Sequence, residues 1–113
     1  MRALVVLAVV LQGLVLAAPA QAAPDDVPDA ARQRELVRMV RQDCGSCHGL
    51  RLTGGLGPSL EAARLAPWPL ESVVATIHQG RPGTPMPGWA PMLSLADARW
   101  IAEQLQRGFP EAR

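Results

Sequence analysis

Three residues that can bond to a metal ion or a cofactor lie within five positions of one another. Cys44 and Cys47 are separated by two residues, and His48 follows the second cysteine directly. Thiols at this spacing can both reach the two vinyl groups on one side of a porphyrin, and the adjacent imidazole is close enough to bind the iron. The pattern C-x-x-C-H therefore predicts one haem c, bonded to Cys44 and Cys47 and ligated by His48.

Other uses of the two cysteines fit the sequence less well. A structural zinc site needs four ligands, but the chain has no third cysteine and only His78 as a further histidine. A redox dithiol of the thioredoxin type expects a β-α-β context, whereas no strand is predicted in this chain. A structural disulfide closes a long loop between distant segments, and two intervening residues are too few for that. We therefore favour covalent haem attachment.

A haem that transfers electrons needs a second axial ligand, and a thioether opposite an imidazole raises its reduction potential. Met86 is the candidate we favour, because it lies 38 residues after His48, far enough to reach the other face of the ring. It stands between Pro85 and Pro87 in the stretch 81–91, where four of eleven residues are proline. Such a stretch forms neither a helix nor a central strand but a stiff, extended strap. The strap would hold a weak neutral ligand in place.

Three other side chains are alternatives to Met86 or have a different expected role. Met92 lies just beyond the strap, and His78 near the end of a predicted helix would give a bis-histidine iron. Met39 precedes the cysteines in the same predicted helix, and we expect it to fill a gap in the core, as methionine often does. An iron with an open position would instead indicate a small peroxidase-like enzyme. Since no carboxylate pair, Ser/His/Asp set or phosphate-binding loop accompanies the motif, we expect an electron carrier and not an enzyme.

The first 22 residues differ in composition from the rest of the chain. Arg2 is followed by an apolar run that is short for a membrane crossing and that ends in an A-x-A cleavage pattern over residues 20–22. This pattern is typical of a secretory signal peptide. The sequence thus predicts a signal peptide over residues 1–22, a flexible extension over 23–29 and one domain over 30–113. We expect a periplasmic protein without stable membrane insertion after cleavage.

The charged residues bear on the kind of partner. The chain has eleven basic and ten acidic residues, and the basic residues do not form the face or stripe that nucleic-acid-binding proteins show. We therefore expect no nucleic acid as partner. The expected partner is a redox protein, and the chain itself is expected to be a monomer.

Apolar periodicity predicts helices and no convincing strand, which is an all-α fold. The predicted helices cover residues 30–43, 69–78 and 94–107. Asp29 and Ser94 are suited to cap the first and last helix, and Gly80 is suited to end the second. The expected buried faces consist of Leu36, Val37, Val40 and Cys44, then Leu70, Val73, Val74 and Ile77, then Leu95, Ala98, Ile101, Ala102 and Leu105. The glycine-rich stretch 49–58 is predicted to be a loop that can lie close to a flat cofactor.

The order of these motifs resembles that of class I cytochrome c domains over residues 35–108. The shared stretches are Cys44-Gly45-Ser46-Cys47-His48-Gly49, Gly57-Pro58-Ser59-Leu60, Ile77-His78-Gln79-Gly80-Arg81 and Met86-Pro87-Gly88-Trp89, then Leu93-Ser94 and a helix. The resemblance implies a compact all-α fold with three to four helices around one covalently bound haem. It also implies that the first and last helices cross, which would bring together Leu36, Val37, Val40, Ile101 and Leu105.

The same resemblance assigns the site residues. They are Cys44 and Cys47 for the thioether bonds, His48 and Met86 as axial ligands, Pro58 as the carbonyl acceptor for His48, and Leu60 and Trp89 in contact with the haem. Class I domains commonly carry an aromatic residue where this chain has Gln104, whereas Trp100 lies one turn earlier and off the predicted apolar stripe. Trp100 either packs against the first helix from another angle or belongs to a docking surface, where aromatic residues are enriched.

Finer details resemble the small periplasmic cytochromes c of NirC type (cytochrome c55X), which accompany the haem c/haem d1 nitrite reductase of denitrifying bacteria. These details lie in the stretches 43–50, 52–58, 80–89 and 98–101. The resemblance implies that the chain donates electrons to that nitrite reductase. It also permits an alternative, an assembly role in the maturation of the haem d1 of the reductase.

Overall fold

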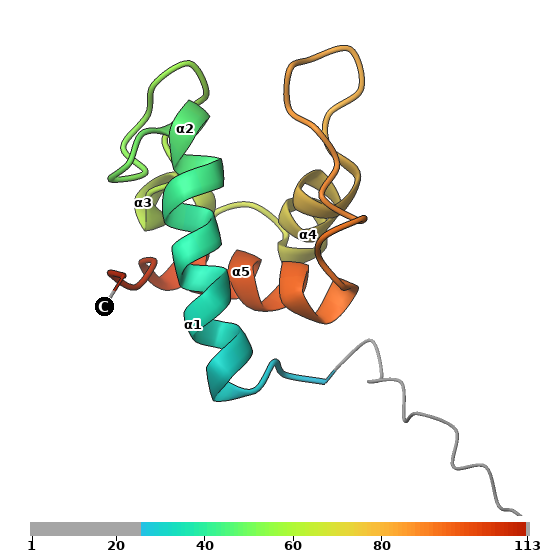
Figure 1. Cartoon of the computed structure of the whole chain (residues 1–113). Helices are drawn as coiled ribbons and strands as arrows, with labels where there is room; N and C mark the ends of the chain where they lie inside the picture. Colours follow the sequence, from blue (N-terminus) through green and yellow to red (C-terminus); the bar gives the residue numbers. More distant parts are fainter. Residues whose placement is uncertain (1–25, 113) are drawn as a thin grey trace, which may run out of the picture.

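Helices joined by loops make up residues 26–112, the part of the chain that this computed structural model describes (Figure 1). The elements in chain order are α1 (Ala30–Met39), η1 (Val40–Cys44), α2 (Gly45–His48), α3 (Ala62–Leu65), α4 (Leu70–Gln79) and α5 (Leu95–Arg107). No strand occurs among these residues, so the predicted all-α class is confirmed. Within the same range, no helix is both long enough and apolar enough to cross a membrane. The predicted signal peptide over residues 1–22 lies outside the described residues.

The attachment motif lies at the end of one long helical segment formed by α1, η1 and α2. Asp29 caps this segment as predicted, since its carboxylate accepts a hydrogen bond from the backbone N–H of Arg32 at 2.8 Å. The segment continues beyond the predicted end at about Asp43, through the cysteines to His48. Between α1 and α2, η1 is a π-helical turn, a rare geometry that is frequent at functional sites. The sequence carried no signal for this turn.

The loop that follows His48 folds back onto α2. The backbone N–H groups of Gly54 and Gly57 each donate to a carbonyl at the end of α2 at 2.8 Å. Leu52 is buried, and its carbonyl accepts a hydrogen bond from the N–H of Leu60 at 2.9 Å. The loop is therefore bound to the motif at Gly54 and Gly57. The short helix α3 that comes next was not predicted, because four residues are too few to show an apolar period.

The proline-rich strap, residues 81–91, is anchored on α4. Pro69 is the N-cap of α4 instead of its first helical residue, and Gly80 ends the helix as predicted, with φ 74°. The chain then turns back, and the N–H groups of Trp89 and Ala90 donate to carbonyls in the last turn of α4 at 3.1 and 3.0 Å. Because both ends of the strap are fixed on one helix, its position follows that of α4.

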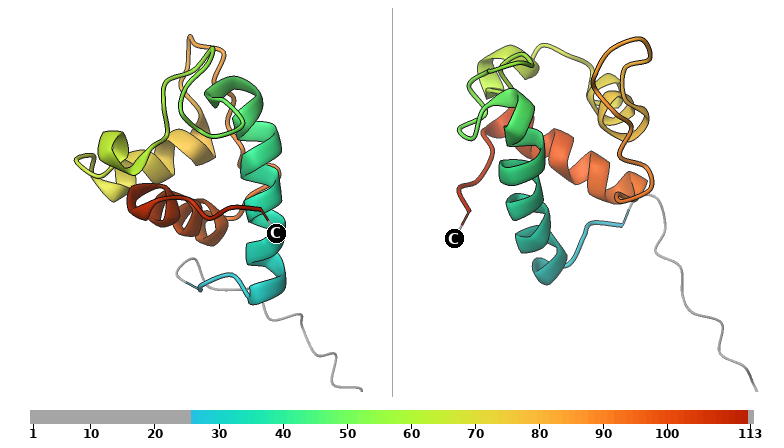
Figure 2. Two further views of the ribbon diagram at one scale, coloured as in Figure 1. Left: turned by 90° about the vertical axis from the view of Figure 1, so that its left-hand side faces the viewer. Right: turned by 45° about the horizontal axis from the view of Figure 1, so that its top comes forward.

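Helix α5 crosses α1 and packs along α4 (Figure 2). The predicted cap is present as a reciprocal pair, in which the Ser94 hydroxyl accepts from the N–H of Asp97 at 3.0 Å and the Asp97 carboxylate accepts from the N–H of Ser94 at 3.1 Å. Such a capping box stabilises a helix start. The crossing joins the expected residues in one buried apolar cluster, which includes Leu36, Val37, Val40, Ile101 and Leu105. The resemblance to class I domains thus predicted the core.

For two side chains of α5, the structure corrects or completes the prediction from the sequence. Leu95 was expected in the buried stripe but is 47% exposed, because the side chains buried in this first turn are those of Ala96 and Asp97. Trp100 is buried, and its ring meets that of Phe109 edge to face with a centroid distance of 6.4 Å. Packing, and not docking, is therefore the role of Trp100.

The C-terminal tail is fastened by Arg41 of η1. The Arg41 guanidinium donates to the carbonyls of Phe109 and Pro110 at 2.8 and 2.9 Å. The same guanidinium lies 5.5 Å from the centroid of the Phe109 ring, within the range of a cation–π interaction. The tail thus covers α5 on one side and is bound to the attachment segment on the other.

Candidate haem site

His48 is held in an orientation that suits a metal ligand. The imidazole is buried, and its Nδ1 lies 2.7 Å from the carbonyl oxygen of Pro58. A carbonyl only accepts hydrogen bonds, so Nδ1 carries the proton and Nε2 keeps its lone pair for a metal ion. Gly57 permits this contact, since a Cβ at that position would lie 2.8 Å from the imidazole ring. The glycine before Pro58 therefore lets the loop lie flat against His48.

The two cysteines lie on the helical turn just before His48. The two cysteines form no disulfide with each other, and Cys44 is half-buried whereas Cys47 is exposed. Burial, followed by the nearby Asp43 carboxylate, raises the pKa of the Cys44 thiol to about 11. Cys44 is thus a neutral thiol near pH 7. Because residues three apart on a helix lie on neighbouring positions of one face, both sulfur atoms are available to the same bound group.

Met86 lies opposite, in the strap. Its side chain is half-buried and contacts that of His48. The backbone around it is fixed by a tight turn, in which the N–H of Arg81 donates to the Met86 carbonyl at 3.2 Å and the N–H of Met86 donates to the Thr84 hydroxyl at 3.3 Å. Gly80 allows this close approach, because a Cβ there would lie 2.7 Å from the Met86 carbonyl oxygen. The structure thus brings together the two side chains that were predicted to be axial ligands.

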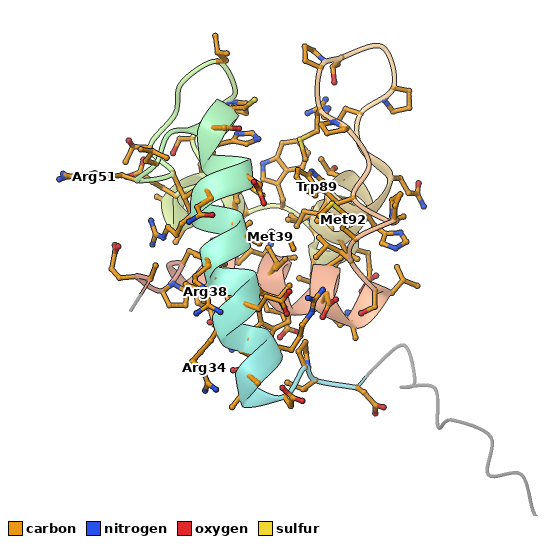
Figure 3. The ribbon with its side chains drawn as sticks, viewed as in Figure 1. Arg34, Arg38, Met39, Arg51, Trp89 and Met92 are labelled. Carbon is orange, nitrogen blue, oxygen red and sulfur yellow. The ribbon has the colours of Figure 1, made fainter. Side chains whose placement is uncertain are left out.

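The alternative ligands occupy different surroundings. Figure 3 shows Met39 on the same side of α1 as Trp89 and Met92. Met39 and Trp89 pack against the buried core, whereas Met92 is largely exposed. His78 is half-buried near the end of α4. Of the remaining predicted site residues, Leu60 also packs against the core. Sequence reasoning had given Met39 only a packing role, and Met39 packs against the core.

The donor set suits an iron porphyrin. An imidazole with a free Nε2 faces a thioether, which is the pairing that favours the reduced iron and raises the reduction potential. Two thiols three residues apart stand beside the imidazole, as two thioether bonds to one ring require. The residues present therefore fit a covalently bound haem, with one ligand from α2 and one from the strap.

Comparisons with known proteins find relatives among the c-type cytochromes. A family model described as cytochrome C oxidase, cbb3-type, subunit III matches residues 28–104. The chain is 53% identical over 105 residues to cytochrome c55X of Paracoccus denitrificans, and the matched residues make up 93% of this chain and 94% of that protein. It is 54% identical over 95 residues to cytochrome c55X of Pseudomonas aeruginosa, which covers 84% and 80% of the two chains. The solved structure of a c-type cytochrome NirC has a TM-score of 0.71 and 58% identity, covering 72% of this chain and 95% of that one.

A more distant relative is an enzyme. The dihydro-heme d1 dehydrogenase of Pseudomonas aeruginosa is 37% identical to this chain over 101 residues, which are 87% of this chain and 18% of the enzyme. The similarity is therefore to one part of a much larger protein.

The fold, the pairing of a histidine with a methionine and the relatives lead to one conclusion. A c-type cytochrome binds haem c covalently and exchanges electrons with a redox partner. The chain belongs to the c-type cytochromes, in the cytochrome c55X family, and it is an electron-transfer protein and not an enzyme.

Proposed function

We propose that the chain is a periplasmic one-electron carrier with a single haem c, which donates electrons to a nitrite reductase of the haem c/haem d1 type. The observation that carries this proposal is the His48 imidazole, hydrogen-bonded to Pro58 at 2.7 Å and in contact with Met86. Support for the partner comes from the relatives named cytochrome c55X and NirC. In this proposal residues 1–22 are the signal peptide, 23–29 an extension and 30–113 a monomeric mono-haem domain.

Each residue of the proposed site has a defined task. When bound, the haem supplies an iron that gains or loses one electron. Cys44 and Cys47 fix the ring by thioether bonds, and His48 is kept in one tautomer by Pro58. Met86 would supply the second ligand to the iron. With both ligands supplied by the protein, no free position would remain for a substrate, as a carrier requires.

A surface near the site suits a transient partner. Leu56 is 95% exposed and Leu50 is 72% exposed, and both lie in the loop that follows His48. Cys47 is exposed at the end of the same turn. Electron carriers bind their partners through small interfaces that dissociate quickly. We propose that these two exposed leucines, called the Leu50/Leu56 surface below, contact the reductase.

Absorption spectra of the purified holoprotein test the ligands. Oxidised protein with His48 and Met86 on the iron has a Met-to-iron charge-transfer band. We expect Met86→Ala to abolish this band and Met92→Ala to leave it intact. A band that survives in Met86→Ala and is lost in Met92→Ala would assign the ligand to Met92. A wild-type protein without the band would exclude methionine ligation altogether.

Electron transfer to purified nitrite reductase tests the partner. The reduced protein should be oxidised by the reductase in the presence of nitrite at a rate that rises with reductase concentration. The Met86→Ala variant is the matched control, because it keeps the surface but changes the iron. No oxidation of the wild-type protein would show that the reductase is not the acceptor.

A second function is favoured by one comparison. Part of a dihydro-heme d1 dehydrogenase is similar to this chain, so a redox role in the maturation of haem d1 is the alternative to donation. Deletion of the gene distinguishes the two. If the reductase from the deletion strain holds its full haem d1 and only receives electrons more slowly, the maturation role is excluded. If it lacks haem d1, donation is not the main function.

A further inference from the structure

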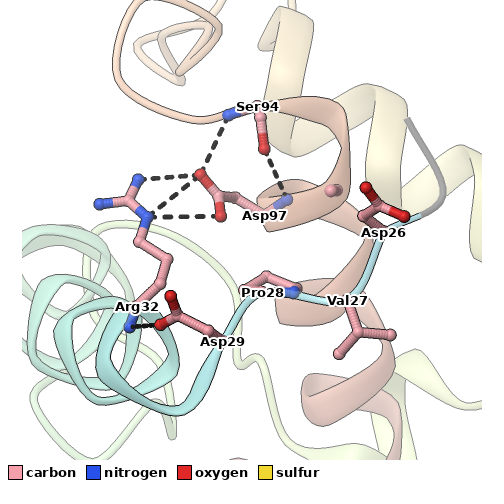
Figure 4. A pocket seen from close by; sticks show the side chains of 8 residues that line it. Asp26, Val27, Pro28, Asp29, Arg32, Ser94 and Asp97 are labelled. Atoms are coloured by element: carbon pink, nitrogen blue, oxygen red, sulfur yellow. Dashed lines mark hydrogen bonds and ion pairs between the residues drawn. The ribbon is translucent and has the colours of Figure 1, made fainter. Parts of the chain in front are cut away.

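Arg32 joins α1 to the start of α5 and to the segment that follows the strap. Its Nη2 donates to the Asp97 carboxylate at 2.8 Å, and its Nε lies 3.3 Å from both carboxylate oxygens (Figure 4). The same Nη2 donates to the carbonyl of Met92 at 3.1 Å. The Asp97 carboxylate also accepts from the N–H of Ser94. Arg32 is thus bound to two points just after the segment that carries Met86.

This ion pair differs from an ordinary surface pair. The Asp97 side chain is nearly buried, and it is bound by two nitrogens of one guanidinium. Charge-assisted bonds of this kind are stronger than neutral ones, and the loss of one partner leaves a buried charge unpaired. The pair also lines a surface pocket with Asp29 and Ser94. None of the residues that line this pocket belongs to the proposed haem site.

The Arg32–Asp97 pair connects the two parts of the fold that carry the two proposed ligands. The strap is bound to α4 through Trp89 and Ala90, so residues 81–91 move with α4. Among residues 26–112, every hydrogen bond and ion pair that joins α1 or α2 to the segment 81–97 comes from Arg32. The two ligands of the proposed site lie on these two parts, His48 on α2 and Met86 in the strap.

We propose that Arg32 is a positioning residue for Met86. By binding Met92 and Asp97 to α1, Arg32 holds the strap at a fixed distance from the helix that carries His48. Without this contact the strap separates from α1 more often, and Met86 leaves the iron more often. This inference rests on the His48 and Met86 ligation proposed above.

Competition by added imidazole on the oxidised holoprotein measures how often Met86 leaves the iron, because imidazole binds only when the thioether is displaced. The test variant is Arg32→Gln. The matched control is Arg99→Gln, since Arg99 also forms an inter-helix ion pair, with Glu71 of α4 at 2.7 Å, without contacting the strap. The two arginine side chains are similarly exposed, 29% for Arg32 and 33% for Arg99.

We expect imidazole to bind Arg32→Gln about tenfold more tightly than it binds the wild-type protein, the effect of losing a buried charge-assisted contact. Arg99→Gln should change the affinity less than about twofold, as a pair with an exposed partner contributes little. Equal affinity in Arg32→Gln and the wild-type protein would overturn the inference, even if the variant unfolds more easily. An equal increase in both variants would also overturn it, since general loosening would then be the cause.

A second variant covers the case in which Arg32→Gln does not fold. Asp97→Asn keeps the size of the side chain and an oxygen for the Ser94 N–H, but removes the charge that binds Arg32. Tighter imidazole binding in Asp97→Asn supports the inference, and wild-type affinity overturns it. The failure of the ligation proposal is recognised separately, because the wild-type protein itself would then lack the Met-to-iron band.

Discussion

At the scale of the residue, the site depends on how closely the loop approaches His48. The carbonyl of Pro58 reaches Nδ1 only because Gly57 leaves room beside the imidazole. The hydrogen bond that sets the tautomer of His48 and leaves Nε2 available therefore depends on Gly57, a residue without a side chain. The resemblance to class I domains pointed to Pro58, and the structure adds Gly57.

Substitution of Gly57 tests this dependence. The Cβ of Gly57→Ala would lie 2.8 Å from the His48 ring, so we expect a displaced imidazole and a loss of about 1 to 3 kcal/mol in the free energy of unfolding. The absorption spectrum of the oxidised protein should change as well. Gly83→Ala is the control, because nothing lies within 4 Å of a Cβ there and the backbone strain at φ 78° should lower stability alone. An unchanged spectrum in Gly57→Ala would contradict this account of the loop.

Asp97 gives a second prediction at this scale. Burial alone would raise the pKa of the Asp97 carboxyl, but hydrogen bonds from Arg32 and Ser94 outweigh burial and hold the pKa below its usual value. A carboxyl with a lowered pKa stabilises the fold above its usual pKa, and this stabilisation is lost as the pH falls through the lowered value. Asp97→Asn should therefore lose about 1 to 2 kcal/mol of unfolding free energy near pH 7.

Urea denaturation at several pH values measures this loss. The difference between the wild-type protein and Asp97→Asn should shrink as the pH falls below about 4. Glu103→Gln on the same helix is the control, because the Glu103 side chain forms no hydrogen bond or ion pair among the described residues. A difference that stays constant with pH would mean that the charge of Asp97 does not stabilise the fold.

At the scale of the element, the C-terminal tail acts on two helical segments at once. Phe109 covers Trp100 of α5, and the carbonyls of Phe109 and Pro110 are bound by Arg41 of η1. Phe109→Ala removes the ring from both contacts, so we expect a loss of about 2 to 4 kcal/mol in the free energy of unfolding. Chemical denaturation measures it. Leu95→Ala, which truncates an exposed side chain of α5, should cost less than about 1 kcal/mol, and equal losses would show that the tail does not matter.

The elements differ in how much of them the sequence predicts. The start of α5 was predicted because Ser94 and Asp97 cap it locally, three residues apart. The end of the attachment helix was not, because a π-helical turn has no residue pattern of its own. The pairing of Arg32 with Asp97 spans 65 residues, and such contacts depend on how helices cross. For the site, the motif predicted Cys44, Cys47 and His48, whereas the assignment of Pro58 needed a family resemblance.

At the scale of the whole molecule, two exposed parts of the surface could meet a partner, the arginines of α1 and the leucines of the loop that follows His48. Figure 3 shows Arg34 and Arg38 on the side of α1 opposite to Met39 and Trp89. The Leu50/Leu56 surface lies in the loop beside His48. The full chain has a formal charge of only +1, so long-range attraction contributes little to association. We therefore expect the apolar surface, and not the arginines, to control the encounter with the partner.

Stopped-flow oxidation of the reduced protein by its partner tests this expectation. Leu50→Ser with Leu56→Ser should slow the second-order rate by about tenfold, since two exposed anchors are lost from a small interface. Arg34→Gln with Arg38→Gln is the control and should change the rate less than about twofold. A slower reaction in the arginine variant with a normal rate in the leucine variant would move the interface to the outer side of α1.

The π-helical turn η1 has a consequence for the direction in which the motif faces. One residue added to a helical turn rotates everything after it by about 100° around the helix axis. The residues before η1 can then follow the apolar period that fits α5, while those after it follow a different phase that directs His48 toward the strap. One continuous helical segment thereby packs against α5 with the residues before η1 and presents His48 to the strap with the residues after it. An uninterrupted α-helix of the same sequence would not direct both sets of residues in this way.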